Sequence, residues 1–187
     1  MANKDDTHLK SEPLESALHE LKALHGRVDE TSRQLAEHHR SRLQCRRGCA
    51  SCCKDDLSVL QIEAENIRRA AKDLLANGVP HPTGACAFLD RDGACRIYLA
   101  RPYVCRTQGL PLRWYEATDD DESGQDQAIV ERRDICPLNL EGPEITLIPD
   151  EYCWLLGPVE DELSQLTQRM GESPQRIPLR SLFADPR

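Results

Sequence analysis

Residues 13–43 show the hydrophobic spacing of one long amphipathic helix. Five apolar residues recur at helical intervals within a segment rich in Glu, Lys, Arg and Gln: Leu14, Leu18, Leu21, Val28 and Leu35. This spacing places them on one face of a helix. The period is close to a heptad, so the face could pair with another helix, but packing against its own domain is the simpler interpretation.

A second helix is predicted over residues 58–77. The segment Ser58-Val59-Leu60-Gln61 has the form of a capping box, in which the Ser and Gln side chains satisfy free backbone N–H groups. Apolar residues then continue at helical spacing until Gly78 and Pro80, which are typical of a helix end.

The remaining pattern predicts a small hairpin and one more helix. Residues 85–89 and 94–98 flank an Asp-Arg-Asp-Gly turn, so we expect two short paired strands. Residues 158–170 have acidic residues in the first turn and a Gly after the last, as a helix does. The acidic stretch 119–124 is typical of an exposed loop, and the Pro-rich C-terminal residues are expected to be loosely held.

Composition limits the size of the core and the class of partner. The chain has 187 residues, of which 4% are aromatic and 30% charged, so we expect a thin apolar core that another kind of bond supplements. The net charge of -8 argues against nucleic acid or an anionic membrane as the main partner. Neither a secretory signal nor a membrane span is evident, which favours the cytoplasm.

These patterns, together with nine cysteines of which four fall within residues 45–53 at spacings typical of metal ligands, predict an α+β fold that is mainly α-helical, with a small β-hairpin and an irregular, metal-stapled, cysteine-rich core. We expect an N-terminal amphipathic helix extension over residues 1–44. A cysteine-cluster metal-binding domain should follow over residues 45–157. A C-terminal helix and tail are expected over residues 158–187.

Eight of the nine cysteines are candidate metal ligands because of their spacing. Thiolates are soft anionic ligands that zinc and iron–sulfur clusters prefer, and the cytoplasm keeps thiols reduced, which disfavours a disulfide framework. Four candidates fall within nine residues and four more follow at intervals: Cys45, Cys49, Cys52, Cys53, Cys86, Cys95, Cys105 and Cys136. Cys153 has no paired spacing and is predicted to be a buried packing residue.

The spacing within the first four cysteines leaves the number of metal centres open. Cys45 and Cys49 share a face if the chain turns helically there, and Cys49-x2-Cys52 is the spacing of a metal-knuckle turn. Adjacent Cys52 and Cys53 point apart, so they suit different centres or different sides of one cluster. Eight cysteines can therefore form two four-sulfur sites, or one site with spare thiols.

The order of these residues resembles the bacterial YkgJ-type cysteine-cluster family, the zinc- or iron-chelating CxxCxxCC domain. The resemblance covers residues 45–137 and rests on Glu63, in the helix after the first cysteines, and on three motifs: Cys45-x3-Cys49-x2-Cys52-Cys53, Cys86-x-Phe-Leu-Asp90 and Cys95-Arg-Ile-Tyr98-x2-Arg101-Pro102-x2-Cys105-Arg106. The first gap is three residues, where many members have two. The resemblance implies chelation of zinc or iron, including as an iron–sulfur cluster. Some larger relatives are associated with protein lysine methylation, but no methyltransferase-sized domain is present here.

Three functions follow as hypotheses, and the sequence leaves open whether the protein is an enzyme. The leading one is a cytoplasmic metal-binding protein with a structural or redox centre. The second is an enzyme using an open iron–sulfur cluster position, because Cys45-x3-Cys49-x2-Cys52 has the spacing of radical S-adenosylmethionine enzymes, although no α/β barrel pattern follows. The third is a module that binds a protein partner through its N-terminal helix. An all-thiolate ligand set and Cys136-Pro137 slightly favour iron–sulfur over zinc.

A few other polar residues are weaker candidates. Three histidines are more simply solvated or locally bonded than metal ligands: His38, His39 and His81. Arg101 and Arg106 either bond to sulfur or carbonyl oxygen around the metal or are ordinary structural arginines. Glu63 is predicted to be an exposed helix carboxylate.

Overall fold

The structure is a computed structural model that describes residues 5–117 and 128–184. The described part contains five α-helices: α1 (Asp5–His38), α2 (Gln61–Ala70), α3 (Lys72–Asn77), α4 (Tyr103–Arg106) and α5 (Pro158–Arg169). It also contains five short strands: β1 (Ser58–Leu60), β2 (Leu112–Ala117), β3 (Ile129–Asp134), β4 (Trp154–Leu155) and β5 (Arg176–Pro178). Short 3-10 turns occupy several connections, the last at Leu179–Phe183. The predicted α+β class is confirmed.

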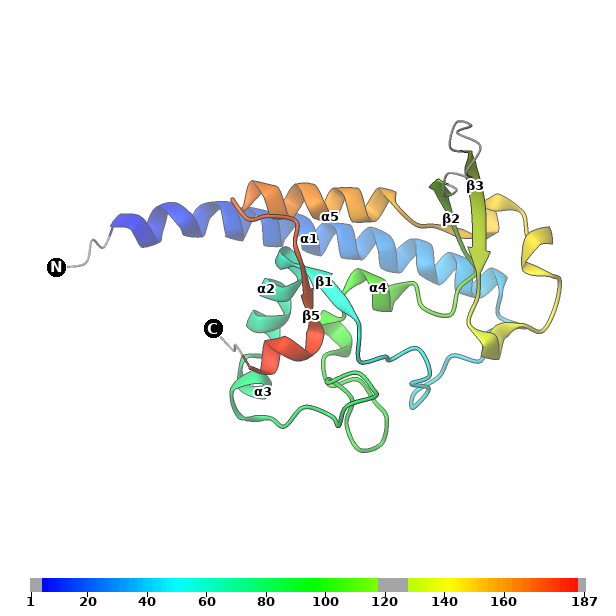
Figure 1. Cartoon of the computed structure of the whole chain (residues 1–187), viewed down its shortest axis with the longest axis horizontal. Helices are drawn as coiled ribbons and strands as arrows, with labels where there is room; N and C mark the ends of the chain where they lie inside the picture. Colours follow the sequence, from blue (N-terminus) through cyan, green and yellow to red (C-terminus); the bar gives the residue numbers. More distant parts are fainter. Residues whose placement is uncertain (1–4, 118–127, 185–187) are drawn as a thin grey trace, which may run out of the picture.

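Helices α1 and α5 form one layer, and the irregular cysteine-bearing loops lie on the other side of α2 and α4 (Figure 1). The apolar face of α1 is buried against α5 and α2, with Leu21, Leu24 and Val28 almost inaccessible. Leu163 and Leu166 of α5 join the same core. The simpler interpretation of the α1 pattern, packing within its own fold, is confirmed.

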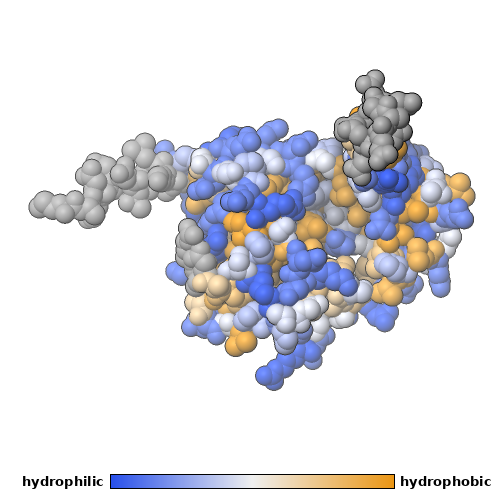
Figure 2. All heavy atoms as spheres, viewed as in Figure 1, coloured by the Kyte–Doolittle hydropathy of each residue, from blue (hydrophilic) through white to orange (hydrophobic). Residues whose placement is uncertain are grey.

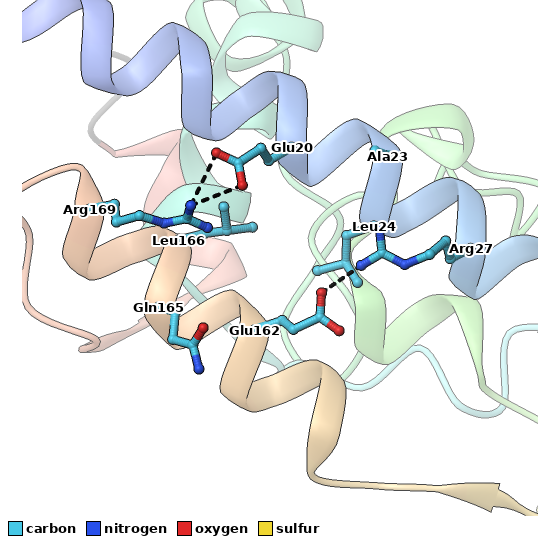
Figure 3. A pocket seen from close by; sticks show the side chains of 8 residues that line it. All are labelled: Glu20, Ala23, Leu24, Arg27, Glu162, Gln165, Leu166 and Arg169. Carbon is cyan, nitrogen blue, oxygen red and sulfur yellow. Dashed lines mark hydrogen bonds and ion pairs between the residues drawn. The ribbon is translucent and has the colours of Figure 1, made fainter.

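Two ion pairs cross the groove between α1 and α5. Arg27 pairs with Glu162 at 2.5 Å and Arg169 with Glu20 at 3.0 Å, with Leu24 and Leu166 between them (Figure 3). These contacts show that the two helices run antiparallel.

A second core lies under the cysteine-bearing loops. Its buried residues come from β1, from α2 and α3, from the segment around Phe88 and from the C-terminal turn: Val59, Ala64, Ile67, Ala71, Leu75, Cys86, Phe88, Leu89, Ile97, Leu179 and Leu182. Helix α2 therefore contributes to both cores. Figure 2 shows hydrophobic residues gathered between hydrophilic edges on this view of the molecule.

Two small sheets connect distant segments. β1 pairs antiparallel with β5, so Ser58 lies opposite Pro178. In the second sheet β2 pairs antiparallel with β3 and parallel with β4. The sequence pattern did not indicate the β2–β3 pair. The acidic stretch 119–124 lies outside the described residues.

Three helix boundaries differ from the predictions. Helix α1 begins before residue 13 and ends at His38, short of residue 43. The predicted capping box at Ser58 is wrong, because Ser58–Leu60 forms strand β1 and α2 begins at Gln61 without a side-chain cap. The helix predicted to continue to residue 77 bends at Ala71, whose φ and ψ are -123° and 27°.

The predicted hairpin at 85–98 is reduced to its turn. A single bridge joins Leu89 to Cys95, and the Asp90 carboxylate accepts hydrogen bonds from the Asp92 and Ala94 N–H groups. The prediction that the C-terminal residues are loosely held is wrong for residues 176–183, because Leu179 and Leu182 are buried, and residues 185–187 lie outside the described part. No helix of the described residues has the length and apolar character needed to cross a bilayer.

Candidate metal centre

The structure brings seven of the eight candidate cysteines to the wall of one open cavity of about 630 Å³. They come from four separate stretches of the chain: Cys45, Cys49, Cys52, Cys53, Cys86, Cys95 and Cys105. The eighth, Cys136, lies near Cys45, since its thiol raises the pKa of Cys45 by repulsion, after the larger effect of burial. All nine cysteines are free thiols.

The first cysteine loop is a series of tight turns rather than a helix. The Cys49 N–H donates to the Arg46 carbonyl at 2.9 Å, and the Cys53 N–H donates to the Ala50 carbonyl at 2.9 Å. Gly48 has a φ of 84°, a left-handed conformation that favours glycine. The loop therefore presents its thiols from successive turns.

The later cysteines are fixed by contacts with this loop and with α2. The Cys86 N–H donates to the Cys53 carbonyl at 2.9 Å, which joins the two stretches directly. Cys105 lies on the short helix α4, whose first N–H, that of Tyr103, donates to the Glu63 carboxylate at 2.6 Å.

Asn139 joins three segments around Cys45. It is completely buried, its Oδ1 accepts from the Gln44 N–H at 2.8 Å, and its Nδ2 donates to the Gly109 carbonyl at 2.8 Å. The same Nδ2 lies 3.7 Å from Cys45 Sγ, and the Asn139 N–H donates to the Cys136 carbonyl. Sequence reasoning missed Asn139, because an asparagine after Cys-Pro carries no distinguishing pattern.

Gly109 allows the backbone to approach the Cys45 thiol closely. Its φ is 91°, and a Cβ placed there would lie 2.4 Å from Cys45 Sγ. Any larger residue at this position would displace the thiol.

Most of the thiols are harder to ionise than usual because they are buried. Burial, followed by repulsion from nearby thiols, raises the pKa of Cys105 to about 12, and burial also raises the pKa of Cys86 and Cys95. Cys52 is the opposite case, since the Cys53 thiol donates a hydrogen bond to it and lowers its pKa to about 6. At neutral pH Cys52 is therefore the thiol most ready to bind a metal ion.

The charges around the cavity suit a negative centre. No Asp or Glu lines the described wall, whereas four arginines do: Arg46, Arg47, Arg101 and Arg106. Arg101 and Arg106 both pair with Asp29 of α1, at 3.3 and 2.6 Å. Arg106 also donates to the Leu99 carbonyl at 3.4 Å, so the contacts of the two residues fit both of the roles predicted for them.

Several weaker candidates have other partners. The prediction that Glu63 is exposed is wrong, since the side chain is buried, at 4% exposure. In addition to the Tyr103 N–H, its carboxylate accepts a hydrogen bond from His25 Nε2 at 3.1 Å. His39 is buried and donates to the Tyr152 carbonyl at 2.7 Å, and His38 stacks on the Tyr152 ring. Cys153 is buried, as predicted.

The donor set fits a thiophilic metal, although its thiols are spread along the cavity wall. Among the described residues no three Cys, His, Asp or Glu side chains stand at the spacing of a metal site. The thiols nevertheless converge on one cavity with a cationic rim and no competing carboxylate in its described wall, which is the chemistry that zinc and iron–sulfur clusters require.

A family model named CxxCxxCC, with the description "Putative zinc- or iron-chelating domain", matches residues 44–137. The chain belongs to the CxxCxxCC family. The match spans all eight candidate ligands and excludes Cys153, which confirms the resemblance drawn from the motifs. Neither a curated protein nor a solved structure matches the chain significantly.

Proposed function

We propose that the protein binds metal through two adjacent four-thiolate centres that serve a structural or redox role. The observation that carries this proposal is the convergence of seven cysteines, from four stretches of the CxxCxxCC domain, on one cavity without an acidic residue in its described wall. A structural centre would join loops that have little regular structure of their own. A redox centre would use an iron–sulfur cluster.

The neighbours of each thiol support a division into two sets. Cys45 is repelled by Cys49, Cys136 and Cys52, which we assign to the first set with it. Burial is the largest effect on the pKa of Cys105, and Cys86, Cys95 and then Cys52 repel its thiolate. We assign the first two of these thiols to the second set, together with Cys105 and Cys53. Cys53 belongs there because it is itself repelled by Cys86 and Cys105, after the larger effects of Cys52 and burial. The vicinal pair Cys52 and Cys53 thus divides between the two centres.

The charge balance agrees with this assignment. A divalent ion with four thiolates carries a net charge of about -2, and so does a [4Fe–4S] cluster with a 2+ core and four thiolates, so two such centres need compensation. Arg46 and Arg47 are exposed at the cavity wall and form no ion pair with a described residue. We infer that these two arginines offset the charge of the loaded centres.

Iron–sulfur is the favoured cofactor, because all eight ligands are thiolates and no imidazole points toward them among the described histidines next to the loop, His38 and His39. Anaerobically purified protein should contain iron and acid-labile sulfide and should show a broad visible absorption that dithionite bleaches. Colourless protein with stoichiometric zinc would support the thiolate centres and would contradict the choice of iron–sulfur as the cofactor. Protein that binds neither metal stoichiometrically contradicts the proposal.

Serine variants test the ligand sets. Cys49→Ser and Cys105→Ser should each remove about half of the bound metal, since they lie in different sets, and the double variant should remove nearly all of it. Cys153→Ser is the matched control and should retain the full metal content, because Cys153 packs away from the cavity. Equal loss from Cys153→Ser and Cys105→Ser would show that the assignment of ligands is wrong.

A further inference from the structure

The C-terminal segment 176–183 lies outside the matched domain but contacts three of its cysteine-bearing stretches. β5 pairs with β1, which follows the Cys52–Cys53 turn. The Leu179 N–H then donates to the Leu57 carbonyl at 2.9 Å, and the Leu179 side chain lines the cysteine cavity. The end of the chain is thus part of the cavity wall.

Arg180 contacts two stretches of chain, one that follows Cys53 and one that precedes Cys86. Its guanidinium donates to the carbonyls of His81 and Ala85, each at 2.8 Å, just before Cys86. Its Nε donates to the carboxylate of Asp55, two residues after Cys53. Asp55 in turn accepts the Gly84 N–H at 3.1 Å.

These contacts surround the hydrogen bond between the Cys86 N–H and the Cys53 carbonyl. The stretches on either side, residues 51–57 and 78–86, contain no regular helix or strand. A guanidinium presents its donors in one rigid plane, so it fixes several carbonyl groups at once. Arg180 therefore sets the distance between two loops that would otherwise vary.

Phe183 supports the same region from behind. Its ring lies 5.0 Å from that of Phe88, and the Arg96 guanidinium covers it at 5.5 Å. Arg96 also donates to the Ala87 carbonyl at 2.7 Å. The segment between Cys86 and Cys95 thus packs on the C-terminal turn.

We propose that Arg180 is a positioning residue of the second thiolate set, and that the C-terminal turn Leu179–Phe183 is an integral part of this metal centre. Arg180 holds Cys53 and Cys86 at the spacing that a shared metal needs, and Leu179 and Phe183 support the loops that carry them. This inference rests on the proposed metal-binding function. Groups that orient metal ligands typically change metal affinity by about 10–100-fold when removed.

Cobalt(II) binding to the full-length protein tests the role of Arg180. In a Cys45→Ser/Cys49→Ser background only the second set keeps all four of its thiols, and thiolate-to-cobalt charge-transfer absorption reports its geometry. Arg180→Lys keeps the charge but loses the planar fork, and Arg180→Gln loses both. We expect both variants to weaken cobalt affinity by about 10–100-fold and to alter the charge-transfer spectrum. Arg180→Gln should bind cobalt less tightly than Arg180→Lys.

Arg176→Lys is the matched control in the same segment. Arg176 bonds to Ser58 and Glu160 and does not contact the cysteine loops, so this variant should keep the affinity within about twofold and leave the spectrum unchanged. Asp55→Asn is an independent variant, because it removes the ionic partner of Arg180. It should also weaken the affinity for cobalt. If the Arg180 variants do not fold, the cobalt affinity of Asp55→Asn tests the positioning role instead.

The outcomes separate the two proposals. Arg180 and Asp55 variants with wild-type affinity and spectrum overturn the positioning role and leave metal binding intact. Failure of the parent protein itself to bind cobalt or any other metal overturns the proposed function.

Discussion

Glu63 shows how one buried side chain can hold a ligand-bearing element in place. Its carboxylate accepts the first N–H of α4 and a hydrogen bond from His25. Glu63→Ala leaves both donors buried without a partner, each at a cost of about 1–3 kcal/mol. We expect a loss of about 3 kcal/mol in the free energy of unfolding, measured by urea denaturation of metal-loaded protein. Glu63→Gln keeps one acceptor oxygen, so its free energy of unfolding should lie between that of Glu63→Ala and that of the wild type.

The control for this prediction is Glu15→Ala. Glu15 is exposed and pairs with Arg69 at the surface, so its removal should cost less than about 1 kcal/mol. Similar losses in the free energy of unfolding for Glu15→Ala and Glu63→Ala would mean that the buried contacts of Glu63 contribute no more to stability than a surface ion pair does.

At the residue scale, sequence reasoning identified candidate ligands but not the residues that position them. Thiol chemistry and spacing single out the cysteines without knowledge of the fold. Glu63 is noted only as part of the family resemblance and Asn139 not at all, and the positioning role of neither is visible, because their partners, Tyr103 and Gln44, are 40 and 95 residues away in the chain. Their roles become visible only when the chain brings these partners together.

At the element scale, apolar packing rather than surface charge holds α5 on α1. Leu163 is 1% exposed within the first core, so Leu163→Ala should lower the free energy of unfolding by about 2–5 kcal/mol. The Arg27–Glu162 pair in Figure 3 is exposed on both sides, so Arg27→Ala should cost less than about 1 kcal/mol. Urea denaturation measures both, and a larger loss for Arg27→Ala than for Leu163→Ala would reverse this assignment.

Local periodicity predicted the elements whose partners do not alter their conformation. The sequences of α1 and α5 have an amphipathic helical pattern of their own, and both segments are helices in the packed structure. Ser58–Leu60 differs, because pairing with Arg176–Pro178 offers these residues a strand ladder in place of a helix start. The hairpin at 85–98 keeps its Asp-Gly turn and the single bridge from Leu89 to Cys95, and Phe88 and Leu89 are buried in the second core.

At the scale of the whole molecule, the two cores depend on metal to different degrees. The first core joins α1, α2 and α5, whose backbone hydrogen bonds lie within helices. The second core packs α2 and α3 against loops that carry cysteines at 52, 53, 86 and 95. Closing such loops costs conformational entropy, which bound metal offsets in the folded state.

Removal of the metal should therefore loosen one side of the molecule more than the other. After chelation under reducing conditions, we expect faster amide hydrogen exchange throughout residues 45–57 and 78–106, and a lower melting temperature. The central turns of α1 and α5 should keep most of their protection, because Leu21, Val28 and Leu163 stay packed without any thiolate contact. Restoring metal should restore protection, and the Cys153→Ser variant should respond as the wild type does. Unchanged exchange in the cysteine loops would show that they fold without metal, and equal loss of protection in α1 would show that the two cores form a single cooperative unit.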